Sequence, residues 1–307
     1  MSYSNSIIFG PIPSRRFGIS LGVDLSPSKK QCNFDCLYCE LEGAKTVDKM
    51  DTNPSITEII NAIKESFDKH PKIDVITLTA NGEPTLYPNL NELIDEINKI
   101  KGDTKTLILS NGSTNYKKEI YDALLKIDTV KLSLDCVSEK CFKKLDRVNK
   151  NVEIEKIIPS MVNFSIETKN DFVLEILFVK DLNDKEDEIV LLYDAVKKIN
   201  PKRVDIGTID RPPAYDVKPV SYEFLESVAD RFENINTNII YKNRPKSIQY
   251  YDKDEIKSML KRRPLTKEDI QNMFDEESKL ILNDLLENKF ISLVNSSGVE
   301  FYKNLQK

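Results

Sequence analysis

The sequence predicts an α/β protein, a partial (β/α)6 TIM-type barrel followed by a small C-terminal winged-helix domain. Two patterns carry this prediction. Strand-like and helix-like segments alternate from Gly18 onward, and after about residue 245 they give way to helices followed by a hairpin pattern. Repeated strand–helix units imply a parallel sheet with right-handed crossovers, and six of them make an incomplete barrel. We therefore expect a barrel over residues 1–245 and a winged helix-like domain over residues 246–307.

Length and composition agree with one large domain plus a small one. The chain has 307 residues, of which 40% are hydrophobic and 31% charged, an ordinary globular composition. The net charge of -5 provides no global attraction to nucleic acid or to an anionic membrane. Residues 1–6 lack the features of a signal peptide, and no apolar run approaches the length of a membrane span. We expect a cytoplasmic protein with no membrane partner.

The predicted barrel elements follow one another in a regular order. Residues 18–25 form the first strand, a cysteine-containing loop follows, and a capping box at Ser55 and Glu58 opens the first helix. Later units repeat this order, with strand-like and helical apolar spacing in turn. Further strands are predicted at residues 73–79, 106–109, 130–134, 172–179 and 203–209, and further helices around residues 90–100, 120–125, 151–168 and 184–199.

The loop after the first strand contains three closely spaced cysteines. Cys32, Cys36 and Cys39 form a C-x-x-x-C-x-x-C run. Three thiolates in one loop can hold a cubane iron–sulfur cluster by three of its irons, which leaves the fourth iron open to a small molecule. The alternative is a structural zinc site with His70, the single histidine, as fourth ligand. The cysteine spacing is not that of the usual zinc pair, so it favours the cluster.

The remaining cysteines and the lone histidine limit the possible chemistry. Cys136 and Cys141 are expected to be small packing residues, with a ligand or thiol role as the alternative. Five cysteines in a chain of this length are not a disulfide framework, which indicates a reducing compartment. A single histidine leaves almost no material for Ser-His-Asp chemistry or for histidine-rich metal sites.

Polar residues also follow the other predicted strands at the point where each strand ends. Because working residues of such barrels lie at strand ends, we expect these segments on one rim, although each alone could be an ordinary turn or helix cap. Glu83 offers a carboxylate to an ammonium group, and Gly82 lets a ligand approach the backbone. Asn111 and Asp135 suit ribose hydroxyls, and Ser133 suits a carboxylate. Together these groups fit an amino acid joined to a nucleoside.

The combined motifs resemble the radical S-adenosylmethionine (SAM) superfamily. The resemblance rests on the cysteine run with Tyr38 before its last cysteine, on the Gly82-Glu83-Pro84 turn, and on the Ser-Asn-Gly and Ser-Leu-Asp strand ends. It covers roughly residues 7–240, judged by the repeated units. It implies a [4Fe–4S] cluster held by Cys32, Cys36 and Cys39, and SAM contacts from Tyr38, Asn81, Gly82, Glu83, Asn111, Ser133 and Asp135.

The same resemblance implies a reaction. An external reductant such as flavodoxin or ferredoxin would reduce the cluster, SAM would be cleaved to methionine and a 5′-deoxyadenosyl radical, and the radical would abstract hydrogen from a substrate. An RNA base and a peptide are the candidate substrates. Two alternatives from other classes stay open: an iron–sulfur redox-sensing regulator acting through the winged helix, and a binding or scaffold protein with a relict metal site.

Three further segments resemble a little-understood group of Fe–S oxidoreductases related to the tRNA wyosine-synthesising enzymes. They are residues 9–16, 20–24 and 208–213. Those wyosine enzymes carry extra upstream cysteines for a second cluster, whereas residues 1–31 of this chain contain none, which argues against pyruvate condensation on tRNA. The chain also has Asn81 where the usual turn has the first glycine of Gly-Gly-Glu.

Four arginines are candidate anion-binding residues. They can bind an anionic substrate or the SAM carboxylate, and ion pairing with acidic residues is an equal alternative for each. They are Arg15, Arg16, Arg147 and Arg211.

The C-terminal segment predicts a winged helix without a strong electrostatic preference. Helices are expected at residues 252–260, 266–274 and 278–288, and two strands at 290–294 and 299–302 around a turn at 295–298. Residues 252–307 contain ten basic and eleven acidic side chains, and only Lys261, Arg262 and Arg263 cluster. Packing on the barrel, or binding a peptide or protein partner, is therefore at least as favoured as nucleic-acid contact.

Overall fold

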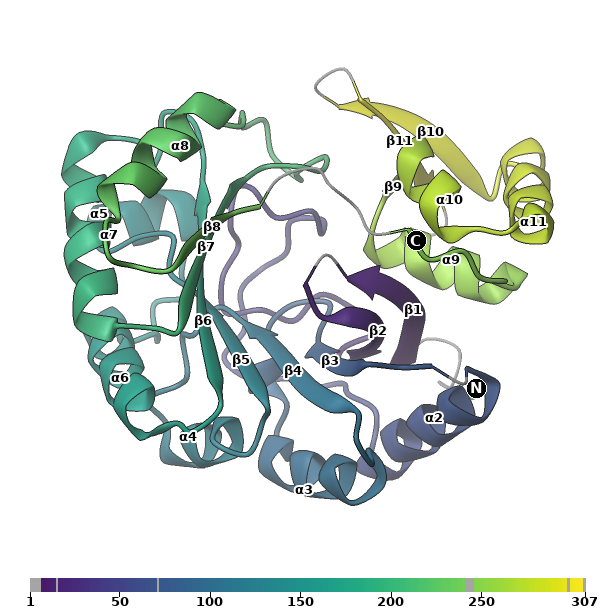
Figure 1. The fold of residues 1–307 in the computed structure, drawn as a ribbon, viewed down its shortest axis with the longest axis horizontal. Coiled ribbons are helices and arrows are strands. Elements are labelled where there is room, and N and C mark those ends of the chain that lie inside the picture. Colours follow the sequence, from purple (N-terminus) through teal and green to yellow (C-terminus); the bar gives the residue numbers. More distant parts are fainter. Residues whose placement is uncertain (1–6, 15, 71, 241–245, 297–298, 306–307) are drawn as a thin grey trace.

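The computed structural model describes residues 7–14, 16–70, 72–240, 246–296 and 299–305. Within them, an eight-stranded sheet follows the chain order from β1 to β8 (Figure 1). β1 is antiparallel to β2, and all later neighbours are parallel. The strands are β1 (Ile8–Ser14), β2 (Gly18–Asp24), β3 (Val75–Thr79), β4 (Lys105–Ser110), β5 (Thr129–Ser133), β6 (Asp171–Phe178), β7 (Arg203–Thr208) and β8 (Thr237–Ile239).

This sheet confirms the α/β class and corrects the number of strands. The six predicted strands are present as β2 to β7, but the two edge strands β1 and β8 were not predicted, so the count of six is wrong. β1 contains Pro11 and Pro13, which cannot donate hydrogen bonds to a ladder and are tolerated at a sheet edge. β8 has only three residues, too few for a periodic pattern.

Helices cover the outer face of the curved sheet (Figure 1). The capping box forms as predicted, because the amide of Glu58 donates to Ser55 Oγ over 3.3 Å and the amide of Ser55 donates to Glu58 over 2.8 Å. The apolar helix faces and the sheet share one buried core. The helices are α2 (Ile56–Lys69), α3 (Leu90–Ile100), α4 (Lys118–Leu124), α6 (Ile154–Glu167), α7 (Glu186–Ile199) and α8 (Tyr222–Arg231).

A buried ion cluster links the two sides of the barrel interior. Asp205 on β7 is fully buried; it accepts a hydrogen bond from Arg203 Nε over 3.0 Å and lies 3.5 Å from Lys131 Nζ on β5. Arg16, in the turn between β1 and β2, also pairs with Asp205. Burial alone would raise the pKa of Asp205, but these three cations hold it below its ordinary value. The ion cluster therefore ties the first hairpin to a strand near the opposite edge of the sheet.

The C-terminal residues have a second, smaller hydrophobic core that also includes Ile12 of β1. Figure 1 shows these elements beside β1. The predicted helices and strands are present, residues 297–298 of the predicted turn lie outside the described residues, and the winged-helix assignment and the boundary at residue 245 stay predictions. The elements are α9 (Lys253–Arg262), β9 (Leu265–Thr266), α10 (Lys267–Met273), α11 (Glu276–Glu287), β10 (Ile291–Ser296) and β11 (Val299–Asn304).

No helix in the described part of the chain is long and apolar enough to cross a membrane.

We expect Asp205→Asn to lower the free energy of unfolding by about 3 kcal/mol, because it leaves buried cations without their charged partner. Chemical denaturation at pH 7 measures this loss. The matched control is Asp171→Asn, which breaks an exposed pair with Lys202 and should cost less than about 1 kcal/mol. Equal losses in the two variants would contradict the prediction.

A comparison of the wild type with Asp205→Asn at different pH values gives a second test. Because the pKa of Asp205 is lowered in the folded state, its stabilising contribution is present at neutral pH and disappears as the pH falls below about 4. The wild type and Asp205→Asn should therefore converge in stability in acid. A difference that grows on acidification would be inconsistent with this assignment.

Candidate functional site

The barrel encloses a cavity of about 590 Å³. Alternate residues of the inner strands face it, such as Thr77 and Thr79 of β3, as the two-residue repeat of a strand requires. Loops after β2, β3, β4 and β7 and residues of the C-terminal elements also contribute to its wall. Of the ten predicted site residues, nine line this one cavity: Cys32, Cys36, Tyr38, Cys39, Asn81, Gly82, Glu83, Asn111 and Ser133.

The cysteine loop is held by a segment that follows β5. This segment consists of α5 (Glu139–Cys141) and a π-helical turn, Phe142–Asp146. The amide of Asp35 donates to the carbonyl of Asp146 over 3.0 Å, and the amide of Leu37 donates to that of Leu145 over 2.9 Å. No sequence pattern predicts this supporting segment, since a π-helical turn has no simple apolar period.

The three thiols fit a multi-iron cluster better than a single ion. Their sulfur atoms do not all lie within 4.8 Å of one another, whereas three thiolates on one tetrahedral zinc would be about 3.8 Å apart. His70 lies elsewhere, with Nε2 3.3 Å from Glu255 Oε1. The zinc alternative is therefore wrong, and the wider spacing suits three corners of a cubane.

Burial controls the protonation of these cysteines. It raises the pKa of Cys32 to about 12, with Glu83 adding to the effect, and it raises the pKa values of Cys36 and Cys39 above the ordinary thiol value. The metal-free thiols are thus neutral at pH 7. Binding of iron must displace their protons, and the positive charge of the metal then compensates the buried thiolates.

The turn after β3 is locked to the start of the cysteine loop. The amide of Gln31 donates to the carbonyl of Asn81 over 2.8 Å, and the amide of Glu83 donates to the carbonyl of Gln31 over 3.0 Å. Between them, Gly82 has a φ of +135°, and an added Cβ would lie 1.9 Å from the Gln31 carbonyl oxygen. Only glycine satisfies both the backbone conformation and the close approach.

Glu83 is a fully buried carboxylate in a fixed orientation. Its Oε1 accepts hydrogen bonds from the amide of Thr85 over 2.9 Å and from Ser110 Oγ over 2.7 Å, and its Oε2 accepts from the amide of Asn111 over 2.8 Å. Burial raises the pKa of Glu83, and these donors oppose the rise without cancelling it. A cationic ligand group in the cavity would favour the ionised form.

Asn111 and Tyr38 connect the cavity wall to the rest of the protein. Asn111 Nδ2 donates to Asn33 Oδ1 over 2.9 Å and lies 3.8 Å from Cys32 Sγ. The Tyr38 hydroxyl donates to Asp135 Oδ2, while the amide of Leu177 donates to Asp135 Oδ1 over 2.6 Å. Both Asp135 oxygens thus accept from protein groups. In this structure Asp135 orients Tyr38, and its expected contact with SAM stays a prediction.

The pKa of Asp135 is raised to about 7, mainly by burial. The hydrogen bonds from Tyr38 and Leu177 oppose this rise only in part.

The candidate anion-binding arginines are ion-paired within the described residues. Arg16 pairs with Asp205, Arg147 lies 3.1 Å from Asp35, and Arg211 lies 3.1 Å from Glu40. Arg16 and Arg211 also line the cavity. Arg15 lies outside the described residues.

Cys136 and Cys141 are buried, as predicted, but they are joined in a disulfide. The packing interpretation did not include this bond, and their short spacing alone did not indicate it.

Comparisons with known proteins agree with the chemistry that the cavity residues suggest. Residues 27–193 match the family model described as the radical SAM superfamily. A "UPF0026 protein" from Helicobacter pylori is 40% identical over 299 residues, covering 96% of this chain and 97% of that protein. Members of the superfamily are enzymes that use a [4Fe–4S] cluster and SAM.

Solved structures show the same fold. Streptococcus suis SuiB bound to its precursor peptide SuiA has a TM-score of 0.58 and 18% identity, covering 76% of this chain and 50% of SuiB. A radical SAM methyltransferase from Sphaerobacter thermophilus has a TM-score of 0.56 and 14% identity, covering 73% of this chain and 67% of that protein. The family match, the full-length relative and the cavity agree, and the chain belongs to the radical SAM superfamily.

Proposed function

We propose that this protein cleaves SAM in the barrel cavity and uses the resulting radical to abstract hydrogen from a substrate bound deeper in the same cavity. The observation that carries the proposal is that nine predicted cluster and SAM residues, drawn from four separate loops and strand ends, line one cavity. Barrels of this kind place reactive groups at the carboxyl ends of the strands.

Some residues of the chain would hold the cluster, and others would orient SAM. Cys32, Cys36 and Cys39 would hold a [4Fe–4S] cluster. When bound, it supplies the electron that cleaves SAM into methionine and a 5′-deoxyadenosyl radical. Glu83 would accept the SAM ammonium group, with its carboxylate already fixed by protein donors. Pre-orientation of this kind lowers the entropic cost of positioning the ligand.

The remaining polar residues would orient the rest of SAM. Asn111 and Ser133 present side chains to the cavity for the ribose hydroxyls and the carboxylate. Tyr38 lies on the same wall, held by Asp135. Asn81 lines the same wall, and Gly82 lets the ligand approach its backbone, since it carries no side chain.

We place the substrate in the deeper interior of the barrel. Lys131, Glu175 and Arg16 also line the cavity, and their charges are paired with each other or with Asp205. Paired charges can re-pair with a polar ligand without leaving a lone buried charge. Because the superfamily is enzymatic, the regulator and scaffold alternatives lose their support.

Reconstituted protein given SAM and a strong reductant under anaerobic conditions should release 5′-deoxyadenosine. Cys36→Ser should bind less iron and release no product above background, because two thiolates cannot hold the cluster in the same way. The control is Lys69→Ala, whose side chain lies outside the cavity lining and away from the cysteine loop, and it should keep its iron. Absence of product from wild-type protein with a full cluster would overturn the proposed function.

Gly82→Ala should weaken SAM binding by more than about tenfold, because the added Cβ displaces the Gln31 carbonyl and separates the turn from the cysteine loop. Equilibrium dialysis with cluster-loaded protein measures the affinity. Gly102→Ala is the matched control: Gly102 also has a positive φ, +56°, but nothing lies within 4 Å of its added Cβ. If both variants bind SAM alike, the turn does not act as proposed.

A further inference from the structure

The C-terminal elements form part of the cavity wall. Arg262, the last residue of α9, and Arg263, its C-cap, line the cavity together with Asp269, Asn272 and Met273 of α10. Of the basic cluster seen in the sequence, only Lys261 is an exposed side chain, and both arginines face the barrel cavity. This arrangement is poorly suited to a phosphate-binding surface.

Arg262 makes a buried, directed ion pair with the barrel. Its Nε donates to Asp24 Oδ2 over 2.8 Å, and its Nη1 donates to the carbonyl of Ser258 over 3.0 Å. The guanidinium also stacks over the Phe9 ring, 5.2 Å from its centroid. The side chains of Arg262 and Asp24 are only 12% and 2% exposed. A charge-assisted hydrogen bond between side chains that are so little exposed to solvent has a well-defined geometry.

Asp24 links Arg262 to the turn that we assign to SAM binding. Its second oxygen, Oδ1, accepts a hydrogen bond from the amide of Asn81 over 2.8 Å and another from the amide of Ser26 over 2.9 Å. Asn81 is the first residue of the turn that contains Gly82 and Glu83. Arg262 and Asn81 therefore hold opposite oxygens of one buried carboxylate.

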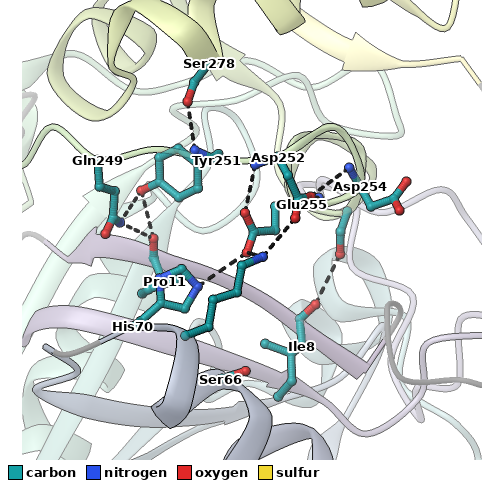
Figure 2. A network of polar contacts seen from close by, with 12 residues as sticks. Ile8, Pro11, Ser66, His70, Gln249, Tyr251, Asp252, Asp254, Glu255 and Ser278 are labelled. Carbon is teal, nitrogen blue, oxygen red and sulfur yellow. Dashed lines mark hydrogen bonds and ion pairs between the residues drawn. The ribbon is translucent and has the colours of Figure 1, made fainter.

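The docking of the C-terminal elements does not depend on Arg262 alone. Figure 2 shows the side chains of Tyr251 and Gln249 beside the carbonyl of Pro11. Each donates a hydrogen bond to it, over 2.8 Å. Asp252 and Glu255 make a second set of contacts with the barrel. Lys69 of α2 lies 2.8 Å from Asp252 and 2.7 Å from Glu255. These outer contacts lie away from the cavity lining, so docking and turn geometry can be perturbed separately.

We propose that Arg262 is a positioning residue for SAM binding, acting through Asp24 on the backbone of Asn81. This inference rests on the proposed function of the turn. Without Arg262, Asp24 is a buried carboxylate without its cation, a state that is strongly disfavoured. The side chain of Asp24 then reorients toward the cavity and releases the Asn81 amide. The turn loses its register, and the ligand contacts of Gly82 and Glu83 weaken.

The test compares Arg262→Gln with Lys69→Ala. SAM affinity is measured by equilibrium dialysis of cluster-loaded protein, and amide hydrogen exchange of residues 79–85 is measured without SAM. Arg262→Gln should bind SAM at least about tenfold more weakly and show faster exchange at the turn. Lys69→Ala, which removes the two outer ion pairs, should stay within about twofold of the wild type in both measurements.

A double-mutant cycle separates positioning from general destabilisation. Asp24→Asn should weaken SAM binding to a similar degree, and Arg262→Gln combined with Asp24→Asn should add little, because both changes break the same link. Should Arg262→Gln fail to fold, Arg262→Lys serves in its place, since lysine keeps the charge but cannot bridge Asp24 and Ser258 together. We expect Arg262→Lys to show the same loss in smaller degree.

Unchanged affinity and exchange in Arg262→Gln would overturn this inference, and so would an equal loss in Lys69→Ala, which would assign the effect to docking. The two failures are distinguishable. Wild-type protein that carries a full cluster but does not bind SAM overturns the proposed function and this inference together. If the wild-type protein binds SAM and Arg262→Gln binds it equally tightly, only the inference is overturned.

Discussion

The backbone pairing of Gln31 with Gly82 is the constraint on which the rest of the site depends. It joins the start of the cysteine loop to the turn after β3 through two hydrogen bonds of 2.8 and 3.0 Å. A side chain at position 82 would occupy the place of the Gln31 carbonyl. The distance between the thiols of the cysteine loop and the Glu83 carboxylate is thus set by main-chain geometry, which is stiffer than any contact between long side chains.

Parallel strand order explains why the other site residues meet. β2, β3, β4 and β5 are neighbours in the sheet, so their carboxyl ends lie side by side and deliver the cysteine loop, the turn at Asn81, Asn111 and Ser133 to one rim. Buried donors then fix the acceptors: Glu83 receives its hydrogen bonds from two different strand ends. The Glu83 carboxylate is therefore satisfied before a ligand arrives, as a low-dielectric site requires.

The features that could be predicted are those encoded over short stretches of sequence. Apolar periodicity located β2 to β7, and nine of the ten residues predicted from the cysteine loop and the strand ends line one cavity. β1 was missed because its prolines obscure the strand pattern. The role of Asp135 could not be foreseen, since its donors Tyr38 and Leu177 are 97 and 42 residues away in the chain. The bond between Arg262 and Asp24 spans 238 residues, and no local pattern predicts such a contact.

The open edge of the sheet gives a physical reason for the C-terminal elements. A partial barrel leaves β1 at an edge, where unpaired backbone carbonyls invite association with other chains. Here those carbonyls accept hydrogen bonds within the molecule: Pro11 from Tyr251 and Gln249, and Ile8 from Ser258. Ser258 lies one helical turn before Arg262, so the contact that covers the edge also brings the guanidinium to Asp24. Protection of the edge and alignment of the turn at Asn81 are therefore two results of the same docking.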